Sequence, residues 1–127
     1  MRFLVNKKTP TINHLYGHFR GRKFIKKEAK ELRADIIDII NEQRKQLGFD
    51  IRDFQERQLK VRVEVHEDWY CKNGAVKRKD VSNREKFLID TVFEALDLED
   101  KFIWEHEMAK IQSDEEFFTV DVDVFNE

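Results

Sequence analysis

The sequence predicts one α+β domain over residues 1–127, with a mixed sheet and the element order β-α-β-α-β-β. Two observations predict it: apolar residues recur at helical spacing in two segments, and they alternate with polar residues in others. The length of 127 residues and the hydrophobic content of 40% suit a single compact domain with its own core. Strand and helix segments that alternate along the chain indicate the α+β class.

The first half of the chain is predicted to hold a strand, a long loop and a long helix. Residues 3–5 are a short apolar run that predicts a strand, and residues 6–23, which include the only proline, predict a loop. From Ile25 to Leu47 apolar residues recur at helical spacing, and Gly48 is a stop signal. The isoleucine-rich stripe of this helix indicates core or a subunit interface rather than a ligand site.

The second half is predicted to hold a strand, a helix and a hairpin. Residues 59–65 alternate between apolar and polar, which is typical of a half-buried strand. A basic loop over residues 70–79 leads into a helix from about Val81 to Leu96. Two further extended runs, residues 103–111 and 117–125, predict a C-terminal hairpin.

Charge is distributed unevenly along the chain. The net charge is -2, yet residues 1–30 carry nine Lys or Arg against one acid, and residues 97–127 carry eleven acids against two Lys. The basic third suits contact with phosphates. In the loop, Arg20 and Arg22 lie among aromatic residues such as Tyr16 and Phe19, which is typical of a loop that grips phosphates and stacks on bases, or of one packed by its own aromatic rings.

Cysteine content and hydropathy limit the setting of the protein. Cys71 is the only cysteine, so neither an intrachain disulfide nor a cysteine-based zinc site can form. No apolar run approaches the length that a bilayer requires. We therefore expect a cytoplasmic, soluble protein without a membrane partner.

The segment from Lys79 to Lys86 is the most informative part of the sequence. It combines a carboxylate, a hydroxyl, an amide and several cations at a predicted junction between a loop and a helix. A helix N-terminus favours anions, because its first N–H groups and its dipole are directed at them. The composition and the position together predict metal and phosphate chemistry.

Four segments occur in the order of the motifs of one family. They are Pro10-Thr11-Ile12-Asn13 with Arg20-Gly21-Arg22, then Val61-Arg62-Val63-Glu64-Val65-His66, then Arg78-Lys79-Asp80-Val81-Ser82-Asn83 with Lys86 and Asp90, and finally Trp104-Glu105-His106-Glu107. On these segments, which span nearly the whole chain, the sequence resembles the RusA family of Holliday junction resolvases. Members of that family are small homodimeric endonucleases that cut four-way DNA junctions with magnesium.

The resemblance implies a metal site that binds Mg²⁺ or Mn²⁺. It implies Asp80, Ser82 and Glu107 as metal ligands, and Asp80, Lys86 and Glu107 as the catalytic set. The chain departs from the family at Ser82, where the family has an aspartate, and at His106-Glu107, where it has two acids. A serine hydroxyl can bind magnesium but is neutral, so we expect weaker metal affinity.

Several other side chains bear on this site. A displaced carboxylate of Glu67, Asp68 or Glu85 could replace the missing aspartate. His106 could be a metal ligand or a proton carrier, although a lone strand histidine is more often structural, and we favour the structural interpretation.

The sequence thus predicts a magnesium-dependent endodeoxyribonuclease that acts as a homodimer on branched DNA, in recombination and repair. One alternative is a RusA-like protein that binds branched DNA but cuts weakly or not at all, because of Ser82. Another is a charged protein-interaction domain without a role on nucleic acid. The predicted DNA contacts are Arg20, Arg22, Lys23, Lys77, Arg78, Lys79 and Asn83.

Overall fold

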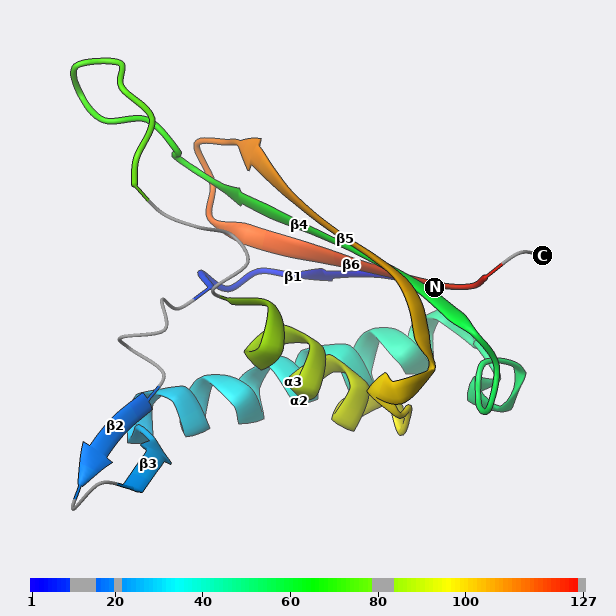
Figure 1. The fold of residues 1–127 in the computed structure, drawn as a ribbon. Helices are drawn as coiled ribbons and strands as arrows, with labels where there is room; N and C mark the ends of the chain where they lie inside the picture. Colours follow the sequence, from blue (N-terminus) through cyan, green and yellow to red (C-terminus); the bar gives the residue numbers. More distant parts are fainter. Residues whose placement is uncertain (10–15, 20–21, 79–83, 126–127) are drawn as a thin grey trace.

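The computed structural model describes residues 1–9, 16–19, 22–78 and 84–125. These residues form one small α+β domain, in which two helices cover one face of a four-stranded mixed sheet (Figure 1). The predicted α+β class is confirmed.

The sheet has the strand order β1-β6-β4-β5. It consists of β1 (Arg2–Val5), β4 (Leu59–Glu67), β5 (Ile103–Gln112) and β6 (Phe117–Val124). β4 pairs in parallel with β5 and antiparallel with β6, which in turn pairs antiparallel with β1. The central strands β4 and β6 therefore have a neighbour on both sides, while β1 and β5 are edge strands.

Alternation along β4 separates the two faces of the sheet. Residues 59, 61, 63, 65 and 67 are buried, whereas the residues between them are partly or fully exposed. Val61, Val63 and Val65 pair with Val122, Val120 and Phe118 of β6, all of which are buried in the core. This confirms the prediction of a half-buried strand, because apolar side chains at every second position are removed from water on one face only.

The two helices bury their apolar residues against the valine-rich face. α2 (Lys27–Leu47) is highly charged and buries only Ala29, Ile36 and Ile40. It ends at Gly48, whose φ of 67° is readily adopted by glycine and whose N–H donates to the carbonyl of Arg44. α3 (Glu85–Leu96) is more apolar, and eight of its twelve residues are buried.

The predicted C-terminal hairpin is wrong. β5 and β6 are consecutive in the chain, but β4 lies between them in the sheet. The reason is the crossover: α3 connects β4 to β5, and such a helical connection returns the chain parallel to the strand that it left. β6 then pairs along the other side of β4.

The predicted loop over residues 6–23 is also partly wrong. Its second part contains β2 (Tyr16–Phe19), which pairs antiparallel with β3 (Arg22–Ile25) in a separate two-stranded sheet. Ile25, which the sequence assigned to the helix, belongs to β3, and α2 begins at Lys27. Strands of four residues carry too little periodicity to be recognised next to a long helical pattern.

Two short 3-10 helices complete the domain, η1 (Ile51–Asp53) before β4 and η3 (Asp100–Phe102) before β5. Across the part of the chain that the structure describes, neither α2 nor any other helix has the length and apolar character that crossing a membrane requires.

Candidate functional site

A pocket of about 270 Å³ lies between α3 and the chain that leads into β5. α3 begins at Glu85, and only Arg84 separates it from the segment 79–83 that carries the sequence motif, so the pocket adjoins the predicted site in the chain. Its walls come from both elements. α3 contributes Glu85, Lys86, Ile89 and Asp90, and the opposite wall consists of Asp100, Ile103 and His106.

A β-bulge shapes the wall on β5. Leu59 and Lys60 are consecutive in β4 but pair with Ile103 and Glu105, so Trp104 is the extra residue, and it is exposed. Strand side chains normally alternate between faces. The extra residue lets Ile103 and His106, three positions apart, both line the pocket.

Lys86 places a cation at this pocket. Its side chain is 80% exposed, and its Nζ lies 3.7 Å from Oδ2 of Asp90, one turn further along α3. An exposed pair of this spacing contributes only about 0.3–0.5 kcal/mol, so the ammonium can leave Asp90 for a phosphate oxygen at little cost.

Asp100 is a pocket residue that was not among the predicted site residues. It begins η3 and lines the same pocket as Lys86. The sequence pattern predicted only that the preceding helix ends at Leu96. The signal that could have found it is the acidic pair Glu99-Asp100, which follows an apolar helix just where the chain returns to the sheet.

His106 joins β5 to the start of α3. Its Nδ1 lies 2.8 Å from Oε1 of Glu85, and its Nε2 is buried without a hydrogen-bond partner among the described residues. A carboxylate accepts hydrogen bonds, so Nδ1 is the donor of this pair. The contact fixes the first turn of α3 to the sheet, in line with the structural interpretation of this histidine.

Glu107 lies on the other face of the sheet. It pairs with Arg62 in the register of β4 and β5, and its Oε2 accepts a hydrogen bond from Arg62 Nη1 at 2.7 Å. His106, its neighbour, lies on the helix side with the pocket. The structure therefore does not bring Glu107 together with Lys86. The ligand role that the resemblance implies for Glu107 is untested, and Asp100 is an alternative at the pocket.

Several predicted residues lie outside the described part of the chain. They are Arg20, Lys79, Asp80, Ser82 and Asn83. Arg22 and Lys23 lie in β3, but their side chains also lie outside the description. Lys77 and Arg78 are described, and they end the hairpin-like turn that follows β4, with Arg78 exposed.

The three carboxylates that could replace the missing aspartate all have partners. Glu85 bonds to His106, as above, and Glu67 accepts a hydrogen bond from the buried Arg84. Asp68 accepts from the side chain of Gln112 at 2.9 Å and from the backbone N–H of residue 70. These two hydrogen bonds hold the pKa of Asp68 below its ordinary value. Of the three, only Glu85 lines the pocket, and its carboxylate is bonded to His106.

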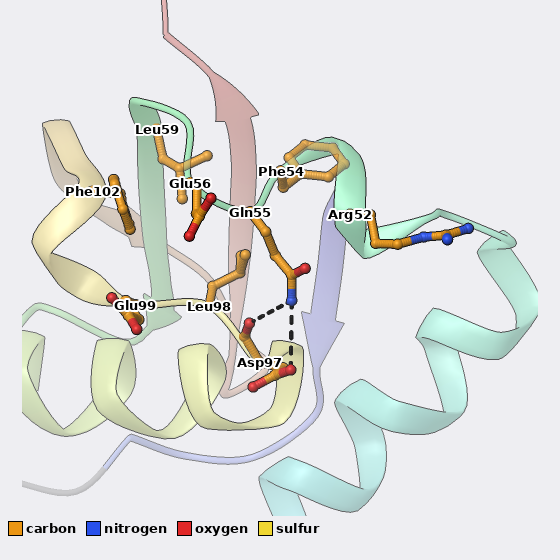
Figure 2. Close-up of a pocket in the computed structure, with 9 residues that line it drawn as sticks. All are labelled: Arg52, Phe54, Gln55, Glu56, Leu59, Asp97, Leu98, Glu99 and Phe102. Atoms are coloured by element: carbon orange, nitrogen blue, oxygen red, sulfur yellow. Dashed lines mark hydrogen bonds between the residues drawn. The ribbon is translucent and has the colours of Figure 1, made fainter.

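A larger cavity, of about 550 Å³, lies at the other end of α3, next to η1 (Figure 2). Gln55 reaches across it, and its Nε2 donates to the backbone oxygen of Asp97 at 3.1 Å. Three carboxylates, those of Glu56, Asp97 and Glu99, line it together with a single cation, Arg52. None of its lining residues belongs to the predicted site, so we do not place the site there.

The donors at the α3 pocket fit magnesium only in part. Within the described ranges, no three His, Cys, Asp or Glu side chains converge closely enough to hold a metal ion. Asp90 and Asp100 nevertheless supply hard carboxylate oxygens, and magnesium needs only one or two carboxylates besides water and substrate oxygens. Asp80 lies outside the described residues, so its role as a ligand stays a prediction.

Comparison with models of known protein families finds no match, and comparison with curated proteins finds no significant match.

Proposed function

We propose that this chain is a RusA-like endodeoxyribonuclease that resolves four-way DNA junctions by metal-dependent hydrolysis of phosphodiester bonds. The observation that carries the proposal is that Lys86 and Asp100 line one pocket at the start of α3, directly after the segment that contains Asp80. A cation beside hard carboxylates suits a phosphodiester group, whose charge rises during hydrolysis.

In this proposal Asp80 and Asp100 hold the metal ion, and Lys86 contacts the scissile phosphate. Asp100 takes the place of Glu107, because Glu107 lies on the opposite face of the sheet and bonds to Arg62. A Mg²⁺ or Mn²⁺ ion held there would supply an activated water and would neutralise charge on the phosphate. Asp90 keeps the Lys86 ammonium near the pocket, and Asn83 orients the substrate.

We further propose that the chain acts as a homodimer on branched DNA. A four-way junction has two-fold symmetry, and its resolution requires two symmetric cuts. Two subunits with one pocket each would match that symmetry. Sedimentation of the purified protein tests this part: a single species with twice the mass of the chain is expected, and a monomer at all concentrations would contradict it.

The experiment for the activity uses a labelled four-way junction and a linear duplex of matching sequence, each with and without Mg²⁺. We expect paired symmetric nicks in the junction only, which require the metal and disappear in Asp80→Asn. Cleavage that persists in Asp80→Asn, or equal cleavage of the duplex, would overturn the proposal.

A second candidate function is binding of branched DNA without efficient cleavage. It is favoured because Glu67, Asp68 and Glu85, the three carboxylates considered as replacements for the aspartate missing at Ser82, each have a bonding partner. The Ser82→Asp variant separates the two functions. If Ser82→Asp cuts junctions much faster than the wild type, the natural site is weakened by the serine. If the wild type is active and the variant cuts at the same rate, Ser82 is sufficient for cleavage.

A further inference from the structure

The segment from Trp69 to Lys77 forms a projecting hairpin, which we call the arm. In Figure 1 it extends beyond the end of β4, away from the sheet and the helices. Its two sides are joined by the antiparallel bridge between Tyr70 and Val76 and by backbone hydrogen bonds, among them Lys77 N–H to Trp69 O at 2.8 Å. Gly74, with a φ of 85°, permits the tight turn at the tip. The arm is therefore an ordered element.

The base of the arm is fixed to the body of the domain. Trp69 is 3% exposed, and its Nε1 donates to the carbonyl of Val65 at 3.2 Å. The guanidinium of Arg84 lies 5.2 Å from the centroid of this ring, and Nζ of Lys110 lies 4.8 Å from it. Arg84 immediately precedes α3, so the contact links the arm to the helix that carries Lys86.

Asp68 adds a second attachment at the same place. Its Oδ1 accepts from the backbone N–H of Tyr70 at 3.1 Å and from Nε2 of Gln112 at 2.9 Å. Gln112, at the end of β5, also accepts from the backbone N–H of Trp69 at 2.8 Å. These bonds hold Tyr70 in a defined position relative to both parallel strands, and hence to the pocket.

The arm exposes apolar side chains between cations. Tyr70 is 47% exposed and Val76 is 59% exposed. Residues paired directly across an antiparallel bridge project to the same side, so the ring and the valine form one small apolar surface. Residues 69–78 contain no Asp or Glu, and Lys72, Lys77 and Arg78 lie close to Tyr70 and Val76 in the sequence.

We propose that the arm binds unpaired nucleotides at the branch point of the DNA, with Tyr70 stacked on a base. An aromatic ring held between cations fits single-stranded nucleic acid, because the base stacks on the ring and the phosphates meet the charges. Base pairs inside a duplex are already stacked on their neighbours, so the ring selects bases that the branch point exposes. This inference rests on the proposed function and deepens it by naming the part of the substrate that the arm recognises.

The test measures binding in EDTA, where no cleavage is needed, of a four-way junction with 2-aminopurine at the branch point, a single-stranded oligonucleotide and a linear duplex. We expect Tyr70→Ala to weaken binding of the junction and the single strand by about tenfold, the loss typical of one stacked base, while duplex binding changes little. Tyr70→Phe keeps the ring and should bind like the wild type. The 2-aminopurine fluorescence should respond to wild type and Tyr70→Phe but not to Tyr70→Ala.

Phe49→Ala is the matched control. Phe49 is also an exposed aromatic residue, at 41%, but it follows α2 and is remote in sequence from the arm. We expect its removal to leave all three affinities unchanged. Thermal unfolding of each variant is the folding control. We expect Tyr70→Ala to unfold at the same temperature as the wild type, so that its weaker binding is not caused by unfolding.

The outcomes separate this inference from the proposed function. Equal affinity of Tyr70→Ala and wild type for the junction, or an equal loss on the duplex, overturns the role of the arm even if the wild type cleaves junctions. Binding that depends on Tyr70 without any cleavage in Mg²⁺ supports the arm and overturns the nuclease. Absence of DNA binding at low salt overturns both.

Discussion

Arg84 and Glu67 form an ion pair in the interior of the protein, with Nη1 of Arg84 2.5 Å from Oε1 of Glu67 and side chains only 1% and 3% exposed. The same Nη1 donates to the hydroxyl of Thr9 at 2.6 Å. Glu67 ends β4 and Arg84 directly precedes α3. The pair therefore fixes the start of α3, and with it Lys86, to the end of the central strand.

Breaking this pair should be strongly destabilising. Arg84→Met leaves the Glu67 carboxylate buried without its cation, and we expect the free energy of unfolding to fall by about 3–5 kcal/mol. Unfolding in urea measures the loss.

Arg33→Met is the control for that prediction, because Arg33 bonds to Glu94 at the surface. A surface pair contributes only up to about 1 kcal/mol. If Arg84→Met proves no more destabilising than Arg33→Met, the buried pair does not hold the domain together as we infer.

Glu64 should make the stability depend on pH in acid. Glu64 lies on the sheet face opposite the helices, where burial alone would raise its pKa. Hydrogen bonds from Arg62 and His66, together with the charges of Arg62 and Arg2, outweigh the effect of burial. The pKa of Glu64 is therefore lowered below its ordinary value. A carboxyl with a lowered pKa stabilises the fold above its unfolded pKa, about 4.3, and this stabilisation is lost as the pH falls through the folded pKa.

The Glu64→Gln variant isolates this contribution. We expect the wild type to be more stable than the variant at neutral pH, by up to about 1 kcal/mol, with the difference shrinking as the pH falls below about 4. Urea unfolding at a series of pH values measures it. A difference that stays constant from neutral pH into strong acid would contradict the assignment.

Lys86 should matter for cleavage and little for stability. Its side chain is exposed and its pair with Asp90 is weak, so Lys86→Ala should leave the unfolding free energy almost unchanged. If Lys86 contacts the scissile phosphate, the variant should cut junctions about 10²- to 10³-fold more slowly, the usual loss when one stabilising group is removed. Single-turnover cleavage measures this rate.

Lys60→Ala is the matched control for Lys86, because Lys60 is an exposed lysine on β4 away from the pocket. It should cut like the wild type. Equal rates for the two lysine variants would remove Lys86 from the proposed site.

The elements with strong local periodicity could be predicted from the sequence. The alternation in β4 and the helical spacing in α2 each indicate which side chains are buried. Both elements occur in the predicted segments, although α2 begins at Lys27. Strand pairing could not be predicted in this way. Whether β6 pairs with β5 or with β4 depends on the crossover through α3, and the hairpin prediction failed for that reason.

The candidate site shows the same division. Lys86 was predicted from the motif and lies at a pocket, whereas Asp100 was missed. The wall that Asp100 shares with His106 depends on the bulge at Trp104 and on the return of the chain after α3. Neither a bulge nor the return path of a chain produces a periodic sequence pattern. The local sequence therefore could not show whether Glu107 or Asp100 faces the pocket.

The most direct test of the account is junction cleavage in Mg²⁺ by Asp100→Asn and Glu107→Gln, beside the wild type and with junction binding measured in EDTA. We predict that Asp100→Asn loses at least about 10²-fold in cleavage rate while it still binds the junction, and that Glu107→Gln cuts like the wild type. Loss of cleavage in Glu107→Gln together with normal cleavage in Asp100→Asn would contradict the placement of the site at the α3 pocket.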